Sequence, residues 1–143
     1  MTTIATTSDV TETTATRSRA VTITLWTVQI LLAVLFVYGG VNKILVLQPE
    51  MREGFAKIGF GDWFMYLTGA MELAGGVGLL IPQLAGVAAL ELAVVMVGAV
   101  LAHLLVLPPP SLALIPGALC IVFLLIARAR RTEIEALARK ITS

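Results

Sequence analysis

Charged residues are scarce in this sequence. Only 13% of the 143 residues are Asp, Glu, Lys or Arg, whereas 58% are hydrophobic. A soluble globular domain carries about 25% charged and about 45–50% apolar residues, so this composition indicates a membrane protein. The formal net charge is only +1, and such a balance gives no reason to expect a nucleic-acid partner.

The sequence also has a single cysteine, Cys120, and a single histidine, His103. A lone cysteine excludes a dithiol redox centre within the chain, and Cys120 is read as a small apolar residue inside a span. The usual bis-histidine haem site needs two histidines. We therefore expect no metal site and no intrinsic cofactor, so that a redox group, such as a quinone or a partner subunit, would have to be borrowed.

The sequence contains long apolar runs. A membrane-spanning helix needs about 20 apolar residues, and Pro82 and the proline run at Pro108–Pro110 interrupt helices between such segments. The sequence predicts an all-α integral membrane four-helix bundle with spans at about residues 22–47, 63–81, 84–107 and 112–127. The first apolar run is too long for a cleaved signal peptide, so we expect it to be retained.

This pattern divides the chain into three parts. Residues 1–20 contain eight threonines and no apolar periodicity, which predicts a disordered tail. Residues 21–127 form the transmembrane domain, and residues 128–143 form a cytoplasmic amphipathic tail.

The distribution of basic residues predicts the orientation. Lys and Arg accumulate on the cytoplasmic side of membrane proteins. The two tails hold seven of them and the opposite side holds three, Lys43, Arg52 and Lys57. Both termini are therefore expected in the cytoplasm.

Two segments outside the spans have helical patterns. In "QPEMREGFAKIGFGDW", a proline at the start, apolar residues at helical spacing and Gly59 as a stop predict a short amphipathic helix on the outer surface, roofing the bundle. In "RARRTEIEALARKITS", Thr132 and Glu135 have capping-box spacing and Ile134, Leu137 and Ile141 share a face. That helix either binds anionic lipid or is a solvated tail helix.

Glu72 is the one carboxylate in "TGAMELAGGVGLLIP". If Trp63 marks the outer interface, Glu72 lies nine residues further in, about 13 Å deep. An unpartnered acid at that depth costs about 2.5–3.5 kcal/mol or more, so Glu72 should face the bundle interior, either paired with a cation or as a protonated strut. Flanking glycines, Gly69, Gly75 and Gly76, allow another helix to approach it closely.

Lys43 and His103 are its candidate partners. Lys43 follows Gly39 and Gly40 on the first span, and His103 shares a helix face with Met96 and Ala99 on the third. Lys43 could point inward to Glu72 or outward to the headgroups. His103 could line the same site or be a hydrogen-bonded strut.

Two further polar residues complete the candidate site. Asn42 stands beside Lys43. Glu91 lies at a depth similar to that of Glu72, but it is rotated by roughly 120° from His103 on the same helix. Glu91 therefore either belongs to a second polar cluster or reaches the cavity from another angle. Two carboxylates and a histidine at staggered depths are also what a proton path contains.

Four segments with these residues, "LFVYGGVNKI", "GFAKIGFGDW", "MELAGGVGLLIP" and "MVGAVLAHLL", resemble the DoxX family of small bacterial four-helix membrane proteins. The resemblance covers about residues 25–127, and Lys43, Glu72 and His103 match the family pattern. It implies a multi-pass protein of the bacterial cell membrane. Some relatives are linked to quinone-dependent sulfur oxidation, others to membrane-associated redox complexes and oxidative stress. The chain shows no second domain of the kind that accompanies the quinone-reducing relatives.

Two functional hypotheses follow. The first is a binding or anchoring component of a membrane-associated redox system, whose partners are the lipid bilayer and redox-complex proteins or a quinone held near Lys43 and His103. The alternative is a quinone-linked oxidoreductase subunit or small proton-coupled carrier that uses Glu72 and His103. The sequence identifies no catalytic residue, leans against an enzyme, and leaves open whether copies of the chain form a homo-oligomer.

Overall fold

The computed structural model describes residues 7–143, with side chains from residue 18 onward. Every regular element in this part of the chain is helical. The elements are α1 (Thr7–Leu45), α2 (Pro49–Ile58), α3 (Asp62–Leu79), α4 (Ala85–Leu105), the 3₁₀ turn η1 (Pro110–Ala113), α5 (Leu114–Ala129) and α6 (Arg131–Thr142).

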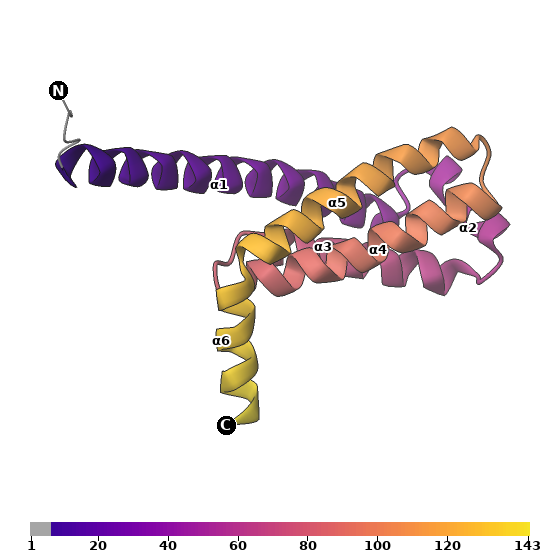
Figure 1. Ribbon diagram of the computed structural model, residues 1–143. Helices are drawn as coiled ribbons and strands as arrows, with labels where there is room; N and C mark the ends of the chain where they lie inside the picture. The colour runs from indigo at the N-terminus through magenta and orange to yellow at the C-terminus, as the bar shows by residue number, and fades with distance from the viewer. Residues whose placement is uncertain (1–6) are drawn as a thin grey trace.

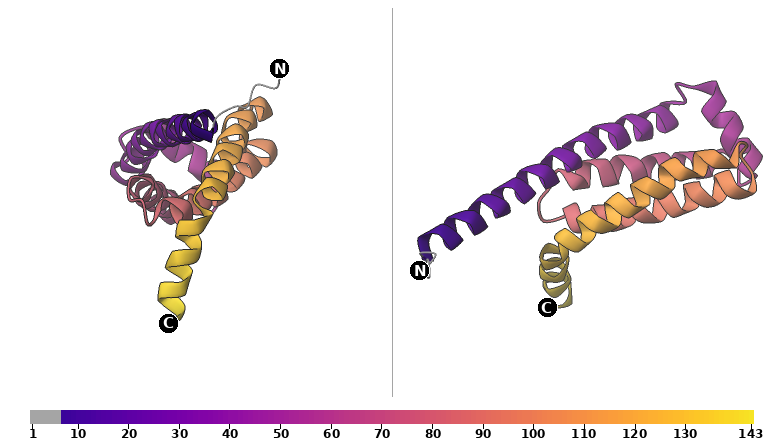
Figure 2. Two further views of the ribbon diagram at one scale, coloured as in Figure 1. Left: turned by 60° about the vertical axis from the view of Figure 1, so that its left-hand side comes forward. Right: turned by 45° about the horizontal axis from the view of Figure 1, so that its top comes forward.

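The long helices α1, α3, α4 and α5 pack against one another, and this group of helices is called the bundle below (Figure 1). α3 lies between α1 and α4, and α5 packs on the other side of α4. α2 covers one end of the bundle, and α6 leaves the opposite end at a steep angle (Figures 1 and 2). These ends are called the α2 end and the α6 end below.

The core lies where the helices cross. Phe36 of α1 and Phe123 of α5 meet edge to face with ring centroids 5.1 Å apart. Leu79 and Leu92 are fully buried beside them. Small residues of α4, Ala88, Ala89 and Ala93, belong to the same cluster and allow close packing in a bundle where lipid supplies no hydrophobic driving force.

Three segments are long and apolar enough to cross a membrane, among the residues that the structure describes: Ser18–Leu45, Ala85–Leu105 and Pro110–Ala129. The chain is therefore a membrane protein, with most outward-facing side chains apolar. The remaining expected span, at residues 63–81, corresponds to α3, whose 18 residues include Asp62, Glu72 and several glycines. This composition lowers its hydropathy, so the fourth crossing stays a prediction.

The first helix is longer than the sequence predicted. α1 begins at Thr7, so residues 7–20 continue the helix where a disordered tail was expected, and residues 1–6 lie outside the described residues. Thr22 and Thr24 donate hydrogen bonds to the carbonyl oxygens of Ser18 and Ala20, four residues earlier. A helix already nucleated in the apolar span can propagate outward, which explains the added turns.

The short helix α2 confirms the expected bounds. It begins at Pro49 and ends at Ile58, with Gly59 at φ 89° as its C-cap. Gly61, at φ 94°, completes the turn into α3. Glycine adopts these left-handed conformations without the steric cost of a Cβ, so the two glycines direct α2 back over the end of the bundle.

The predicted capping box of the last helix is wrong. Arg130 is the N-cap of α6, without a side-chain hydrogen bond to the backbone, and Thr132 lies inside the helix. Its hydroxyl donates instead to the Glu133 carboxylate, at 3.0 Å. α5 ends only at Ala129, so the two helices are nearly continuous and leave no extended residue at Thr132 to act as a cap.

Candidate functional site

Glycines bring α1 and α3 into close contact. A Cβ added to Gly40 would lie 2.6 Å from the carbonyl oxygen of Gly69, and one added to Gly69 would lie 2.8 Å from Lys43 Cβ. Only glycine permits this backbone approach. The contact fixes the start of the Lys43 side chain directly against α3.

A buried ion pair lies at this crossing. Lys43 Nζ donates a hydrogen bond to Glu72 Oε2 over 2.7 Å, and the two side chains are 13% and 9% exposed. Gly39 leaves room for the carboxylate, because a Cβ there would lie 3.0 Å from Glu72 Oε2. Of the two orientations open to Lys43, the structure has the inward one, and Glu72 has a cationic partner.

The ion pair opens on a cavity of about 430 Å³. Its walls come from α1, α3 and α4, and α2 covers it. Most of the lining is apolar, including Phe55, Ile58, Phe64 and Val95. Cavities of this size hold small molecules, and a few polar groups in an apolar lining usually set the ligand's orientation.

His103 lies at the wall of the same cavity, near the end of α4. Its Nδ1 is buried and has no hydrogen-bond partner among the described residues. A buried polar atom without a partner costs about 1–3 kcal/mol, so this nitrogen is suited to a ligand or to water. No strut-like hydrogen bond of Nδ1 to the described part of the protein is present.

The structure thus brings Lys43, Glu72 and His103 to one cavity. Their roles in ligand binding or proton transfer stay predictions. The fourth polar group of the lining is Thr68, whose hydroxyl donates to the Phe64 carbonyl oxygen at 2.8 Å. Its lone pairs leave it able to accept a further hydrogen bond.

α2 is attached to the bundle mainly through side chains. Arg52 pairs with Asp62 at the start of α3, and Phe55 meets Phe64 with ring centroids 5.8 Å apart. The nearby Asp62 raises the pKa of the Arg52 guanidinium through a hydrogen bond and its charge, so Arg52 stays positively charged at physiological pH. No residue of α2 is buried, so it is a cover for the cavity and not part of the core.

Asn42 and Glu91 do not belong to the cavity lining. Asn42 is buried, and its amide nitrogen donates to the Tyr38 carbonyl oxygen in its own helix at 2.7 Å. Glu91 lies in a separate groove of about 450 Å³ between α3 and α4, formed largely by small residues. Both of its carboxylate oxygens are buried without a partner among the described residues.

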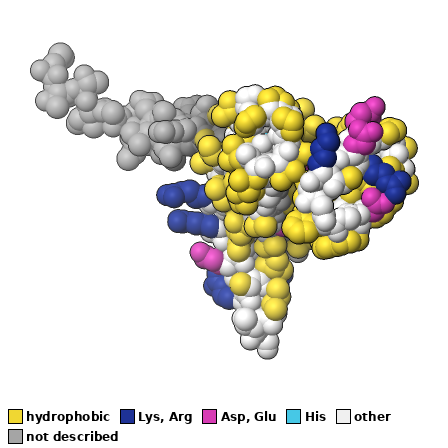
Figure 3. All heavy atoms as spheres, turned by 90° about the vertical axis from the view of Figure 1, so that its right-hand side faces the viewer, with side chains coloured by type: hydrophobic (Ala, Val, Ile, Leu, Met, Phe, Trp, Pro, Cys, Tyr) yellow, Lys and Arg dark blue, Asp and Glu magenta, His cyan; other side chains and the backbone are white. Residues whose placement is uncertain are grey.

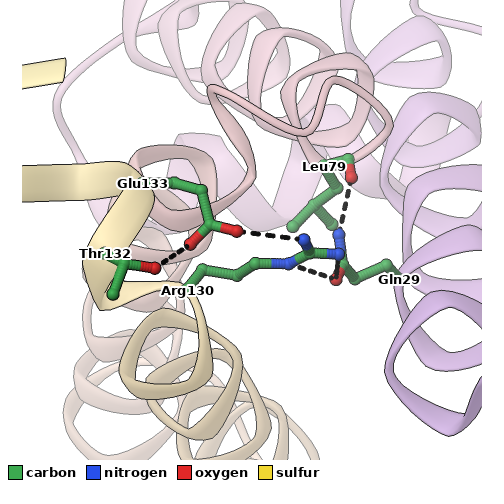
Figure 4. Close-up of polar contacts among 5 residues, drawn as sticks. All are labelled: Gln29, Leu79, Arg130, Thr132 and Glu133. Carbon is green, nitrogen blue, oxygen red and sulfur yellow. Dashed lines mark hydrogen bonds and ion pairs between the residues drawn. The ribbon is translucent and has the colours of Figure 1, made fainter. Parts of the chain in front are cut away.

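A second polar cluster lies at the α6 end and was not predicted (Figure 4). Arg130 donates from Nε and Nη2 to Gln29 Oε1, at 3.1 and 2.9 Å. Gln29 is fully buried and donates in turn to the Leu79 carbonyl oxygen at 2.8 Å. The signal in the sequence was an amide in the middle of the first apolar run, with an arginine just beyond the last one.

Comparison with known proteins identifies the family of the chain. No curated protein and no solved structure matches the chain. The model of the DoxX-like family matches residues 27–126, a segment that contains all of α3 and α4, most of α5, the second half of α1 and the whole cavity. Because this match covers well over half of the sequence, the chain belongs to the DoxX-like family.

Proposed function

We propose that the protein crosses the bacterial cell membrane four times, with both termini in the cytoplasm. The support for the fourth crossing is the position of α3 between two apolar spans. Its 18 residues rise about 27 Å at about 1.5 Å per residue, close to the thickness of a bilayer core. Its carboxylate Glu72 points inward, so α3 exposes no charge of its mid-section to lipid.

A reporter that is active only outside the cytoplasm tests this orientation. Fused after Ser143 it should be silent, because the α6 end carries most of the Lys and Arg residues. Inserted near Gly59, in the turn that follows α2, it should be active. The reverse pattern would overturn the orientation, and equal activity at both positions would overturn the span number.

We further propose that the protein is a binding or anchoring component of a membrane-associated redox system. The observation that carries this is the cavity under α2, where an apolar lining meets the Lys43 and Glu72 pair and the unpartnered Nδ1 of His103. This combination suits one amphiphilic molecule, either a lipid or a quinone, with its polar group held near Lys43 and His103. The redox context comes from the family resemblance.

The donors of the cavity fit a quinone. Its carbonyl oxygens would accept hydrogen bonds from Lys43 and His103, and Phe55 and Phe64 would contact its ring. A bound quinone would supply electron-transfer chemistry at this position. The part of Lys43, Glu72 and His103 is to hold and orient the molecule and to keep its polar end away from the apolar walls.

A second candidate is proton transfer through Glu72 and His103, in a quinone-linked oxidoreductase subunit or a small proton-coupled carrier. It is favoured by the presence of both side chains at one cavity. It is disfavoured by the engagement of Glu72 with Lys43, because Glu72 Oε2 already accepts a hydrogen bond from the Lys43 ammonium and would have to be released before it could exchange a proton with a substrate.

Mass spectrometry of molecules that co-purify with the protein tests the binding function. We expect a lipid or quinone to remain with the wild-type chain in mild detergent, and less of it to remain with His103→Ala. Cys120→Ala is the matched control, because Cys120 is half-buried in α5 and does not line the cavity. Equal retention by both variants, or no retained amphiphile at all, would contradict the proposal.

A further inference from the structure

The helix α6 crosses the direction of the bundle at the α6 end (Figures 1 and 2). If the long helices span the bilayer, a helix in this orientation runs along its surface. None of its residues is fully buried, and only Ile134 packs against the core of the bundle. The partner of the rest of its apolar face therefore lies outside the described chain.

The start of α6 is firmly attached. Arg130 is held by Gln29, and its guanidinium also lies over the Trp26 ring, 5.0 Å from the centroid. Arg130 Nη1 donates to Glu133 Oε1 at 3.2 Å, within the first turn of α6. Through Gln29 and the Leu79 carbonyl, these contacts connect α1, α3 and α6, so the direction in which α6 leaves is set by the core.

Ile134 shows which way the apolar face points. A Cβ added to Gly86 of α4 would lie 2.5 Å from Ile134 Cγ1, so Ile134 packs against the end of the bundle. Leu137 and Ile141 follow three and seven residues later and share this face. They therefore point toward the level of the bundle, which is the level of the bilayer.

The exposed part of this face agrees with that direction. Ile141 is 76% exposed. Figure 3 views the molecule from the α2 end, and the visible side of the projecting segment carries hydrophobic side chains, with Lys and Arg side chains along one edge. Exposed apolar residues that face away from the bilayer would favour a soluble partner. In α6 they face toward the bilayer.

The charges of α6 complement an anionic surface. Arg131, Arg139 and Lys140 are exposed and lie off the apolar face. A Lys or Arg near an anionic membrane surface contributes about 1 kcal/mol to binding, and apolar insertion adds to it. Zwitterionic lipid would attract these side chains less, because its own cations balance its phosphates and leave no negative surface potential.

We propose that α6 is an interfacial helix that binds the headgroup region of anionic lipid, with Leu137 and Ile141 inserted at the acyl boundary and with Arg131 and Lys140, which flank the apolar face on either side, on the phosphates. The attachment at Arg130 holds it in this plane. The assignment does not depend on the cavity under α2 or on any ligand bound there, so either can fail without the other.

The test uses the full chain in nanodiscs, with Cys120→Ala to remove the native thiol. A fluorophore is attached at Ile141→Cys, on the apolar face, or at the matched position Ala136→Cys, which is exposed on the opposite side of α6. Lipids with a quencher on the acyl chain should quench the Ile141 label several-fold more strongly than the Ala136 label when phosphatidylglycerol is present.

Charge dependence completes the test. In phosphatidylcholine alone, or after Arg131→Gln with Lys140→Gln, the ratio of inserted to free α6 should fall, by about fivefold for each basic side chain. Equal quenching at both label positions would overturn the proposal, as would quenching that ignores lipid charge. Protection of the Ile141 label only in discs that hold two copies would overturn it in favour of self-association.

Discussion

The ammonium of Lys43 lies 2.7 Å from Glu72 Oε2, and both side chains are largely buried. The pair joins α1 to α3 beside the glycines that let the two backbones approach. A buried ion pair is seldom a net source of stability, but removing one member leaves a buried charge without compensation.

Glu72→Gln should therefore destabilise the protein by about 3–5 kcal/mol, because the Lys43 ammonium loses its counter-ion. The double variant with Lys43→Met should regain much of that loss, since neither charge then remains buried. Thermal unfolding in detergent of the two single variants and the double variant measures this coupling. Small, additive effects would mean that Glu72 is a protonated strut.

The contact between Gly40 and Gly69 predicts a second effect. Gly40→Ala should destabilise the protein by about 1–3 kcal/mol, because the new Cβ would lie 2.6 Å from the Gly69 carbonyl oxygen and 2.8 Å from the Leu73 nitrogen. Backbone atoms in packed helices cannot move aside as a flexible side chain can. The melting temperature in detergent checks this.

Gly98→Ala is the matched control for that substitution. Gly98 lies inside α4 with no atom within 4 Å of an added Cβ, so alanine there should be neutral or stabilise the helix by up to about 1 kcal/mol. Equal losses at Gly40 and Gly98 would show that alanine affects the helices generally and not the α1–α3 contact.

Local patterns in the sequence predicted much of the fold. The prolines, Gly59 and the apolar runs placed the ends of α2, α3, α4 and α5 within a few residues, and the spacing of Gly39, Gly40 and Gly69 indicated the close α1–α3 approach. The length of α1 was missed because polar threonines mask a helix that grows out of its neighbour. Thr132 was misjudged because an N-cap residue must itself have a non-helical backbone conformation, which spacing does not reveal.

The site was harder to predict from the sequence than the helices. Helical phase placed Glu72 and Lys43 on facing stripes, and it separated Glu91 from His103, which line different hollows. Helical phase could not show that Gly75 faces Glu91 on α4 and does not face α1. Adjacent residues of a helix point about 100° apart, so neighbouring glycines can contact different helices. The Arg130 and Gln29 contact joins residues 101 positions apart, and no local pattern predicts such a pair.

Glu91 gives a third prediction. Its oxygens are buried without partners, and replacing such a group by an apolar one of similar shape is nearly neutral or stabilising. Glu91→Leu should therefore keep or raise thermal stability, by up to about 1 kcal/mol, whereas Glu72→Leu should lower it. A large loss on Glu91→Leu would show that Glu91 has a partner in the membrane, such as a second copy of the chain.

The last prediction concerns pH at the α6 end. Partial burial would raise the pKa of Glu133, but hydrogen bonds from its own backbone, from Thr132 and from Arg130, together with the charge of Arg130, outweigh it and hold this pKa below its usual value. A carboxyl whose pKa is lowered by folding stabilises the folded state above its unfolded pKa of about 4.3.

That contribution should be complete at neutral pH and lost as the pH falls below about 4, through the lowered pKa of Glu133. Since the pair is partly exposed, the loss should be about 0.5 kcal/mol or less. Trp26 fluorescence in a Trp63→Phe background can follow it, because protonation of Glu133 removes one of the contacts that position the Arg130 guanidinium over the Trp26 ring. Glu133→Gln should remove the pH dependence between neutral pH and this range, and an unchanged profile in that variant would assign the transition to another carboxyl group.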